Sequence, residues 1–197
     1  MSTFLEMLQR RNWVVLDTET TGLHYAEVIQ IGVVDPDGNV LLDTLCRPLK
    51  PIPYDATRIH GITTEIANTG QSWPDVNAQL ARILDGKDLI IYNASYDLEQ
   101  LQNSDALHGL TSNWYQALNG IHCAMLWYAE YWGDWDDYHG NNRWQRLTNA
   151  IHQQGLRENA AHSALGDALM TRDLILHVAQ VISQNDAAES PHGGNAA

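Results

Sequence analysis

Short apolar runs alternate with helical stripes along the chain, and together they predict an α/β fold. Apolar runs closed by turn formers are typical of strands. They lie at Trp13–Asp17, Glu27–Val34, Val40–Cys46, Asp88–Tyr92 and the start of Ile121–Tyr131. Apolar side chains at helical spacing occupy Trp73–Leu84, Ser95–Leu101, Arg143–Gln154 and Ser163–Ser183. Strands first, and then strands alternating with helices, predict a sandwich of helices around a mixed sheet.

Turn residues and the chain ends divide the sequence further. The segment Asp35–Asn39 is rich in turn formers and predicts a hairpin between the second and third strands. We expect residues 1–12 to form a short helical lead-in and residues 13–183 to form one domain. Residues 184–197 are small and polar, which predicts a disordered tail.

The composition is that of an ordinary globular protein, with 44% apolar and 18% charged residues among 197. Cys46 and Cys123 form no CxxC pattern, which argues against a cysteine zinc site or a disulfide framework and fits a reducing compartment. No signal-peptide core and no apolar run long enough to cross a bilayer is found, so we expect a cytoplasmic protein without a membrane partner.

Acidic side chains stand where the first apolar strand ends. Asp17 and Glu19 are two residues apart, so on a strand their side chains point to the same face. Carboxylates in such a place are costly unless something positive compensates, and a divalent cation bound by oxygen atoms does so. The alternative is a strand end with ordinary polar residues. Gly22, just beyond, allows backbone N–H groups to approach a ligand closely.

Two later segments add an acid and a histidine. Asp97 lies in the first turn of the helix that follows a strand, where it either binds a metal or complements the helix dipole. His162 and Asp167 would stand about 140° apart around a helix, so they converge only if His162 precedes the helix. Ser163 as the N-cap gives that arrangement. Taken alone, a histidine at a helix start is more often structural.

In combination, the three segments closely resemble the DnaQ-like DEDDh superfamily of 3′–5′ exonucleases, to which the proofreading epsilon subunits belong. The resemblance rests on DxE, on a strand-to-helix aspartate, on HxxxxD and on an HGIT segment: Asp17 and Glu19, Asp97, His162 and Asp167, and Arg58–Thr63. It covers about residues 13–182. It implies a ribonuclease H-like fold, in which a central mixed five-stranded β-sheet is flanked by α-helices.

The resemblance also implies a two-metal mechanism. Asp17, Glu19, Asp97 and Asp167 would be the metal ligands for two Mg²⁺ or Mn²⁺ ions, with Asp17 bridging both ions and Asp97 acting through bound water. His162 would be the general base that takes a proton from the attacking water.

A second set of residues is expected to bind the terminal nucleotide. The turn after the first strand would contact it through backbone N–H groups and an apolar side chain, while weaker candidates form the pocket wall. These residues are Thr18, Thr20, Thr21, Gly22 and Leu23 in the turn and His60, Asn93 and Tyr96 in the wall. For His60 the alternative is a histidine hydrogen-bonded within its own loop. Family members often carry His where this chain has Tyr92, and Phe where it has Tyr96.

Residues 127–144 are unusually aromatic and have no counterpart in the family pattern. Four of the seven tryptophans lie there, joined by three tyrosines. Such rings form stacking platforms for bases, but interleaved acids repel phosphate. The acids favour the alternative, an insertion that packs on itself or on a partner.

Three functions remain open. The first is a metal-dependent 3′–5′ exonuclease acting on DNA ends, which the HGIT segment favours; the second is an RNA-trimming relative, and the third is an inactive interaction subunit on the same fold. The net charge of −13 argues against a grip on long duplexes. The enzyme would then hold few nucleotides, use its cations as the positive charge, or be recruited by a polymerase or another protein.

Overall fold

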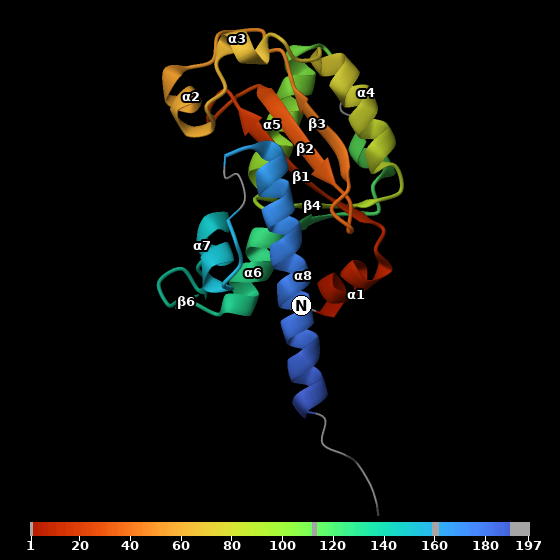
Figure 1. The fold of residues 1–197 in the computed structure, drawn as a ribbon, viewed down its shortest axis with the longest axis vertical. Helices are drawn as coiled ribbons and strands as arrows, with labels where there is room; N and C mark the ends of the chain where they lie inside the picture. The colour runs from red at the N-terminus through yellow and green to blue at the C-terminus, as the bar shows by residue number, and fades with distance from the viewer. Residues whose placement is uncertain (1, 112–113, 159–161, 190–197) are drawn as a thin grey trace, which may run out of the picture.

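A five-stranded mixed sheet forms the centre of the computed structural model, which describes residues 2–111, 114–158 and 162–189 (Figure 1). The strands are β1 (Trp13–Thr20), β2 (Val28–Val34), β3 (Val40–Leu45), β4 (Asp88–Ile91) and β5 (Gly120–Cys123), in the order β3-β2-β1-β4-β5. Strands β1, β4 and β5 are parallel, whereas β2 runs antiparallel to both of its neighbours. The predicted mixed sheet and its first hairpin are confirmed.

Helices cover both faces of this sheet. One face carries α1 (Ser2–Arg10), α6 (Ala124–Trp132), α7 (Leu147–Gln153) and α8 (Ala164–Glu189). The other carries α4 (Trp73–Leu84), α5 (Ala94–Leu107) and the 3-10 turn η1 (Trp114–Ala117). The short helices α2 (Tyr54–His60) and α3 (Thr64–Ala67) pack against Ile29 in a third, smaller cluster. Two-residue strands β6 (Trp135–Asp136) and β7 (Asn141–Asn142) form a separate hairpin.

The alternation of side chains along β1 decides what each face of the sheet receives. Trp13 and Val15 are buried among the helices around α8, and Val14 and Leu16 among those around α4 and α5. Continuing the period of two, the acids at positions 17 and 19 face α8, and the threonines at 18 and 20 face α5. The strand therefore delivers carboxylates to one face and hydroxyls to the other.

The structure corrects several predicted boundaries. The helix predicted to begin at Ser95 is α5, which begins at Ala94 with Asn93 as its N-cap, and the Ser95 hydroxyl donates to Asn93 Oδ1. Helix α7 begins only at Leu147, because the backbone N–H of Arg143 is bonded to Asp134 O and closes the hairpin.

The two chain ends also differ from expectation. Helix α8 continues to Glu189, so residues 184–189 are helical and the predicted tail begins too early; residues 190–197 lie outside the described residues. The exposed small and polar residues after Ser183 permit this because they neither break a helix nor require burial. At the other end, Phe4, Met7 and Leu8 of α1 are buried in the main core, so the lead-in packs as part of the domain.

Candidate active site

Three carboxylates meet where the end of β1 passes beneath the start of α8. One oxygen each of Asp17, Glu19 and Asp167 lies within 4.8 Å of the other two. Asp17 and Glu19 come from β1, and Asp167 comes from the first turn of α8. Three oxygen ligands at this spacing match the donor set that hard divalent cations prefer.

The close approach of α8 depends on two residues of β2 that sequence reasoning missed. Gly32 pairs with Asp17, and a Cβ there would lie 2.5 Å from the backbone nitrogen of Leu165. Gln30 pairs with Glu19, and its Oε1 accepts the Ala164 N–H at 3.2 Å, which satisfies a free donor at the helix start. The available signal was a glycine inside an apolar strand, which often marks close backbone contact.

Asp97 joins the site from the opposite side of β1. It is buried, and its Oδ1 accepts the Thr18 backbone N–H at 3.2 Å and the Thr18 hydroxyl at 2.7 Å. Burial raises the pKa of Asp97 to about 7, against the lowering effect of the Thr18 hydrogen bonds. Asp97 lines the same cavity of about 190 Å³ as the other three acids, although it lies outside the tight group.

Burial and then mutual repulsion raise the pKa values of these carboxylates. Burial, and then the charges of Asp97 and Asp167, raise the pKa of Asp17 well above its usual range. Burial and the charge of Asp167 raise the pKa of Glu19 to about 8. Negative groups crowded in this way are relieved either by protons or by a cation. The donor set and its charge therefore fit divalent metal ions.

His162 stands at the mouth of this cavity, as the N-cap argument predicted. It lies just before α8 with a left-handed backbone (φ 67°) and is exposed to solvent. Ser163 Oγ accepts the Gly166 N–H at 3.1 Å, and Ser163 O accepts the Asp167 N–H at 2.9 Å, so Ser163 caps the helix. The cap turns the chain so that His162 and Asp167 border one cavity.

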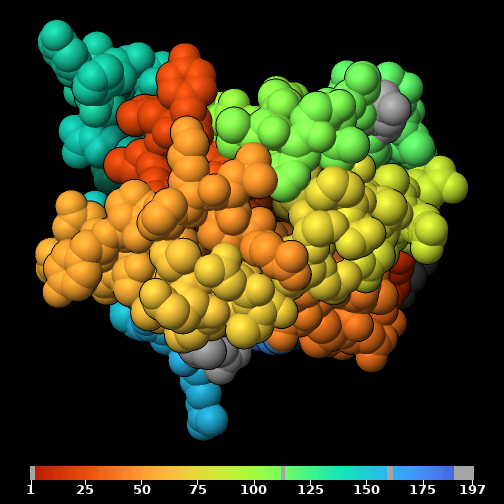
Figure 2. All heavy atoms as spheres, turned by 90° about the horizontal axis from the view of Figure 1, so that it is seen from above, coloured from red at the N-terminus to blue at the C-terminus, as the bar shows by residue number. Residues whose placement is uncertain are grey.

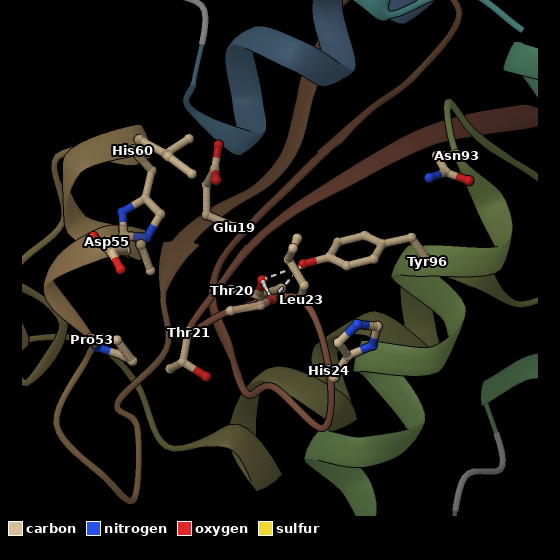
Figure 3. Close-up of a pocket in the computed structure, with 13 residues that line it drawn as sticks. Glu19, Thr20, Thr21, Leu23, His24, Pro53, Asp55, His60, Asn93 and Tyr96 are labelled. Carbon is tan, nitrogen blue, oxygen red and sulfur yellow. Dashed lines mark hydrogen bonds between the residues drawn. The ribbon is translucent and has the colours of Figure 1, made fainter.

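A second, larger pocket of about 760 Å³ adjoins the acid cavity (Figure 3). The two share Glu19, Asn93 and Tyr96 in their linings. Of the residues expected to bind the nucleotide, seven line this pocket: Thr20, Thr21, Gly22, Leu23, His60, Asn93 and Tyr96. Thr18 lines only the acid cavity, where it holds Asp97. The apolar side formed by Pro53, Ala56 and Ile59 was not among the predicted residues.

Hydrogen bonds fix the turn that forms the pocket floor. Tyr96 Oη donates to Gly22 O at 2.7 Å and lies 2.6 Å from Thr20 Oγ1, whose hydroxyl also bonds Gly22 O. Figure 3 shows Tyr96 reaching across to Thr20 from α5. Leu23 follows this anchored turn and is 71% exposed at the pocket. The turn thus offers an apolar side chain on a fixed support.

His60 lies in the pocket wall and also forms a hydrogen bond within its own loop. Its Nδ1 accepts the Ile62 N–H at 3.0 Å within its own loop, and the ring also lines the pocket. Burial lowers its pKa, so the ring is neutral at pH 7. Its Nε2 has no hydrogen-bond partner among the described residues.

Two strand carboxylates, two helix carboxylates and a histidine around a cavity on a ribonuclease H-like sheet define a class, the metal-dependent nucleases. The chain belongs to the RNase T exonuclease family, whose sequence profile matches residues 14–175. This is the DnaQ-like DEDDh group, and the chain is a 3′–5′ exonuclease of that group with a candidate acidic metal site.

Individual relatives agree with the family. An exonuclease of Escherichia phage 186, CP81, is 38% identical over 166 residues, covering 82% of this chain and 85% of the phage protein. A DNA polymerase III subunit epsilon-like protein of Rhodobacter capsulatus is 30% identical over 87% of this chain, but this chain spans only 24% of that longer protein.

Solved structures show the same fold. Exonuclease I of E. coli in complex with a dT13 oligonucleotide superposes with a TM-score of 0.70 at 19% identity, covering 91% of this chain and 44% of that one. Exonuclease X in complex with 5′ overhanging duplex DNA gives 0.63 at 21% identity, covering 87% and 93%. Among the described residues, no helix is both long and apolar enough to span a membrane.

Proposed function

We propose that this exonuclease acts on DNA, removing nucleoside monophosphates from a single-stranded or frayed 3′ end. The observation that carries the proposal is the joined pair of cavities. The acid cavity can hold cations and a phosphate. The pocket beside it, which has an apolar side, can hold one nucleotide. The name of the epsilon-like relative, and the DNA bound in the two exonuclease structures, support DNA as the substrate.

Four acids are proposed to hold two Mg²⁺ or Mn²⁺ ions. Asp17 is buried and feels the charges of Asp97, Asp167 and Glu19, and it would hold the ions together with these three acids. Bound cations supply positive charge at the phosphate, where negative charge builds up during cleavage. A protein with a net charge of −13 repels phosphate in general, but the bound cations would attract it at the site itself.

The remaining residues orient the strand end and move a proton. His162, exposed at the cavity mouth, is proposed to take the proton from the attacking water, a task suited to an imidazole at neutral pH. Leu23 is proposed to pack on the terminal base, with Thr20, Thr21 and Gly22 beside its sugar. His60 and Asn93 form the walls, and Tyr96 holds the turn in place.

The experiment uses 5′-labelled single-stranded DNA and RNA of the same sequence with Mg²⁺ or Mn²⁺. We expect a ladder shortened from the 3′ end, stronger for DNA, and no cleavage after chelation with EDTA. Asp17→Ala should abolish cleavage and His162→Ala should slow it at least about 100-fold. Asp43→Ala removes an exposed acid of β3 away from the cavity and serves as the control.

The outcomes separate the candidates. A faster ladder on RNA would replace DNA by RNA as the substrate. Full activity in either catalytic variant, or in EDTA, would contradict the assigned roles. Recruitment by a polymerase is also proposed, on the epsilon-like relative alone, and would appear as copurification with a polymerase subunit from the native host.

A further inference from the structure

The aromatic hairpin, residues 133–144, presents large rings that its own fold leaves uncovered. Trp135, Tyr138 and Trp144 are 56%, 90% and 60% exposed. The sequence favoured an insertion that packs on itself or on a partner, and for these three rings the first of these alternatives is wrong. Seen from above the end of the molecule that carries the site, teal residues of this region project at one corner (Figure 2).

Hydrogen bonds close the hairpin although its rings are exposed. Asp136 accepts the Tyr138 N–H at 3.0 Å and Arg143 Nε at 3.1 Å, and its Oδ2 lies 2.9 Å from His139 Nδ1. The backbone N–H of Arg143 closes the loop on Asp134 O at 2.8 Å. Rings held on a fixed support lose little freedom when a ligand stacks on them.

Two of the three acids of the hairpin, Asp134 and Asp136, pair with Arg143, whereas Asp137 is exposed. Hydrogen bonds from His139 and Arg143 lower the pKa of Asp136 to about 2, and Arg143 also lies 3.9 Å from Asp134. Further along, Arg146 is exposed and makes no ion pair within the described parts of the chain. The strip from Arg143 to Arg146 therefore offers an exposed tryptophan two residues before an arginine that is not paired with the acids of the hairpin.

This strip leads directly to the acid cavity. Tyr92 Oη donates to Gln145 O at 2.8 Å, and both Tyr92 and Leu147 line the cavity. Neither of them lines the pocket for the terminal nucleotide, which shares Glu19, Asn93 and Tyr96 with the cavity. Consider a strand whose last nucleotide fills that pocket and whose scissile phosphate lies in the cavity. The nucleotides on its 5′ side can continue along the part of the cavity lined by Tyr92 and Leu147.

We propose that the aromatic hairpin is a stacking platform for unpaired bases that lie 5′ of the terminal nucleotide, with Arg146 beside their phosphates. The proposal rests on the proposed function, since it needs a nucleic-acid strand in the cavity. Stacking needs no net positive charge and tolerates any base sequence. An acidic exonuclease can hold a single strand in this way.

The test compares a thymidine dodecamer, long enough to reach the hairpin, with a thymidine dinucleotide, which is confined to the cavity and pocket. The ratio of kcat/KM for the longer to the shorter substrate is measured in the wild-type protein and in Trp135→Ala/Trp144→Ala. The loss of two stacking rings should lower this ratio by roughly 30-fold, through KM. Tyr115→Ala removes a half-exposed ring of η1, near the opposite end of the sheet, and should leave the ratio unchanged.

Binding provides a readout that does not need cleavage. With Ca²⁺ in place of Mg²⁺, the anisotropy of a labelled dodecamer gives its affinity and the dependence of that affinity on salt. The double variant should bind roughly 30-fold more weakly, and Arg146→Gln should reduce the salt slope by about 0.7, the value for one phosphate contact on a single strand. Near-native thermal melting would show that the variants fold.

The two proposals fail in different ways. If the wild-type protein binds the dodecamer through the hairpin but cleaves nothing, the platform stands and the proposed function falls. If cleavage occurs but both the ratio and the affinity are unchanged in the double variant, the platform is refuted, and a protein partner becomes the occupant of the hairpin.

Discussion

Replacing Glu19 by glutamine should stabilise the metal-free protein while removing its response to metal. The carboxylate is crowded by Asp167 and Asp97 and partly buried, so its pKa in the folded state is about 8 instead of 4.5. The folded protein therefore binds a proton that the unfolded chain releases, and stability falls as the pH rises from about 4.5 to about 8. Glutamine is neutral at every pH and does not have this cost.

The size of the effect follows from the pKa shift. At 1.36 kcal/mol per unit, the raised pKa corresponds to about 4 kcal/mol at pH 8. Because Glu19 borders an open cavity, solvent screens part of this energy, and we expect about half, roughly 2 kcal/mol. For a chain of this length that is an increase of about 4–8 °C in the melting temperature. At pH 5 the advantage should shrink to about 0.8 kcal/mol, since Glu19 is then protonated when folded and only the partial ionisation of the unfolded chain remains.

Thermal unfolding by circular dichroism in EDTA, at pH 8 and at pH 5, measures this directly. Saturating Mn²⁺ at pH 8 should reverse the order, because the wild-type carboxylate gains a cation and the amide is a poor ligand. Asp43→Asn, a change at an exposed position, is the matched control. A variant less stable than wild type in EDTA at pH 8, or a gain equally large at pH 5, would refute the electrostatic reasoning.

Three other consequences follow from the packing and the charges. Asp105→Ala should destabilise the fold by about 3 kcal/mol in urea denaturation, because this buried carboxylate accepts three hydrogen bonds from two tryptophans and an asparagine; a change below about 1 kcal/mol would contradict this. Gly32→Ala should cost about 2–3 kcal/mol and weaken Mn²⁺ binding, because its Cβ meets the Leu165 backbone; unchanged stability would show that α8 has room. Mn²⁺ binding at pH 7 should release on the order of two protons, from Asp17 and Glu19, measured calorimetrically in buffers of different ionisation enthalpy; a heat independent of buffer would exclude it.

Sequence reasoning succeeded where the information is local. The apolar run before Asp17, the period of two that joins it to Glu19, and the serine that caps α8 are all set by neighbours in the chain. These features predicted that His162 and Asp167 border one cavity, and the structure places them there.

The rest depended on pairing between distant segments. That Gly32 lies opposite Asp17 follows from the register of β1 and β2, and its contact with Leu165 joins residues far apart in sequence. The exposure of Trp135 and Trp144 likewise depends on a hairpin closed by Arg143, which composition alone does not reveal. Tertiary contacts of this kind leave no periodic trace in the sequence.

The shared boundary at Glu19, Asn93 and Tyr96 separates two linings with different tasks. Ala56 and Ile59 of α2 line only the larger pocket, and they are apolar, unlike the carboxylates of the acid cavity. Base or sugar preference can therefore drift, or be redesigned, by changing one short surface helix while the cleavage chemistry is left intact. Different residues on α2 would therefore let the same catalytic core act on different substrates.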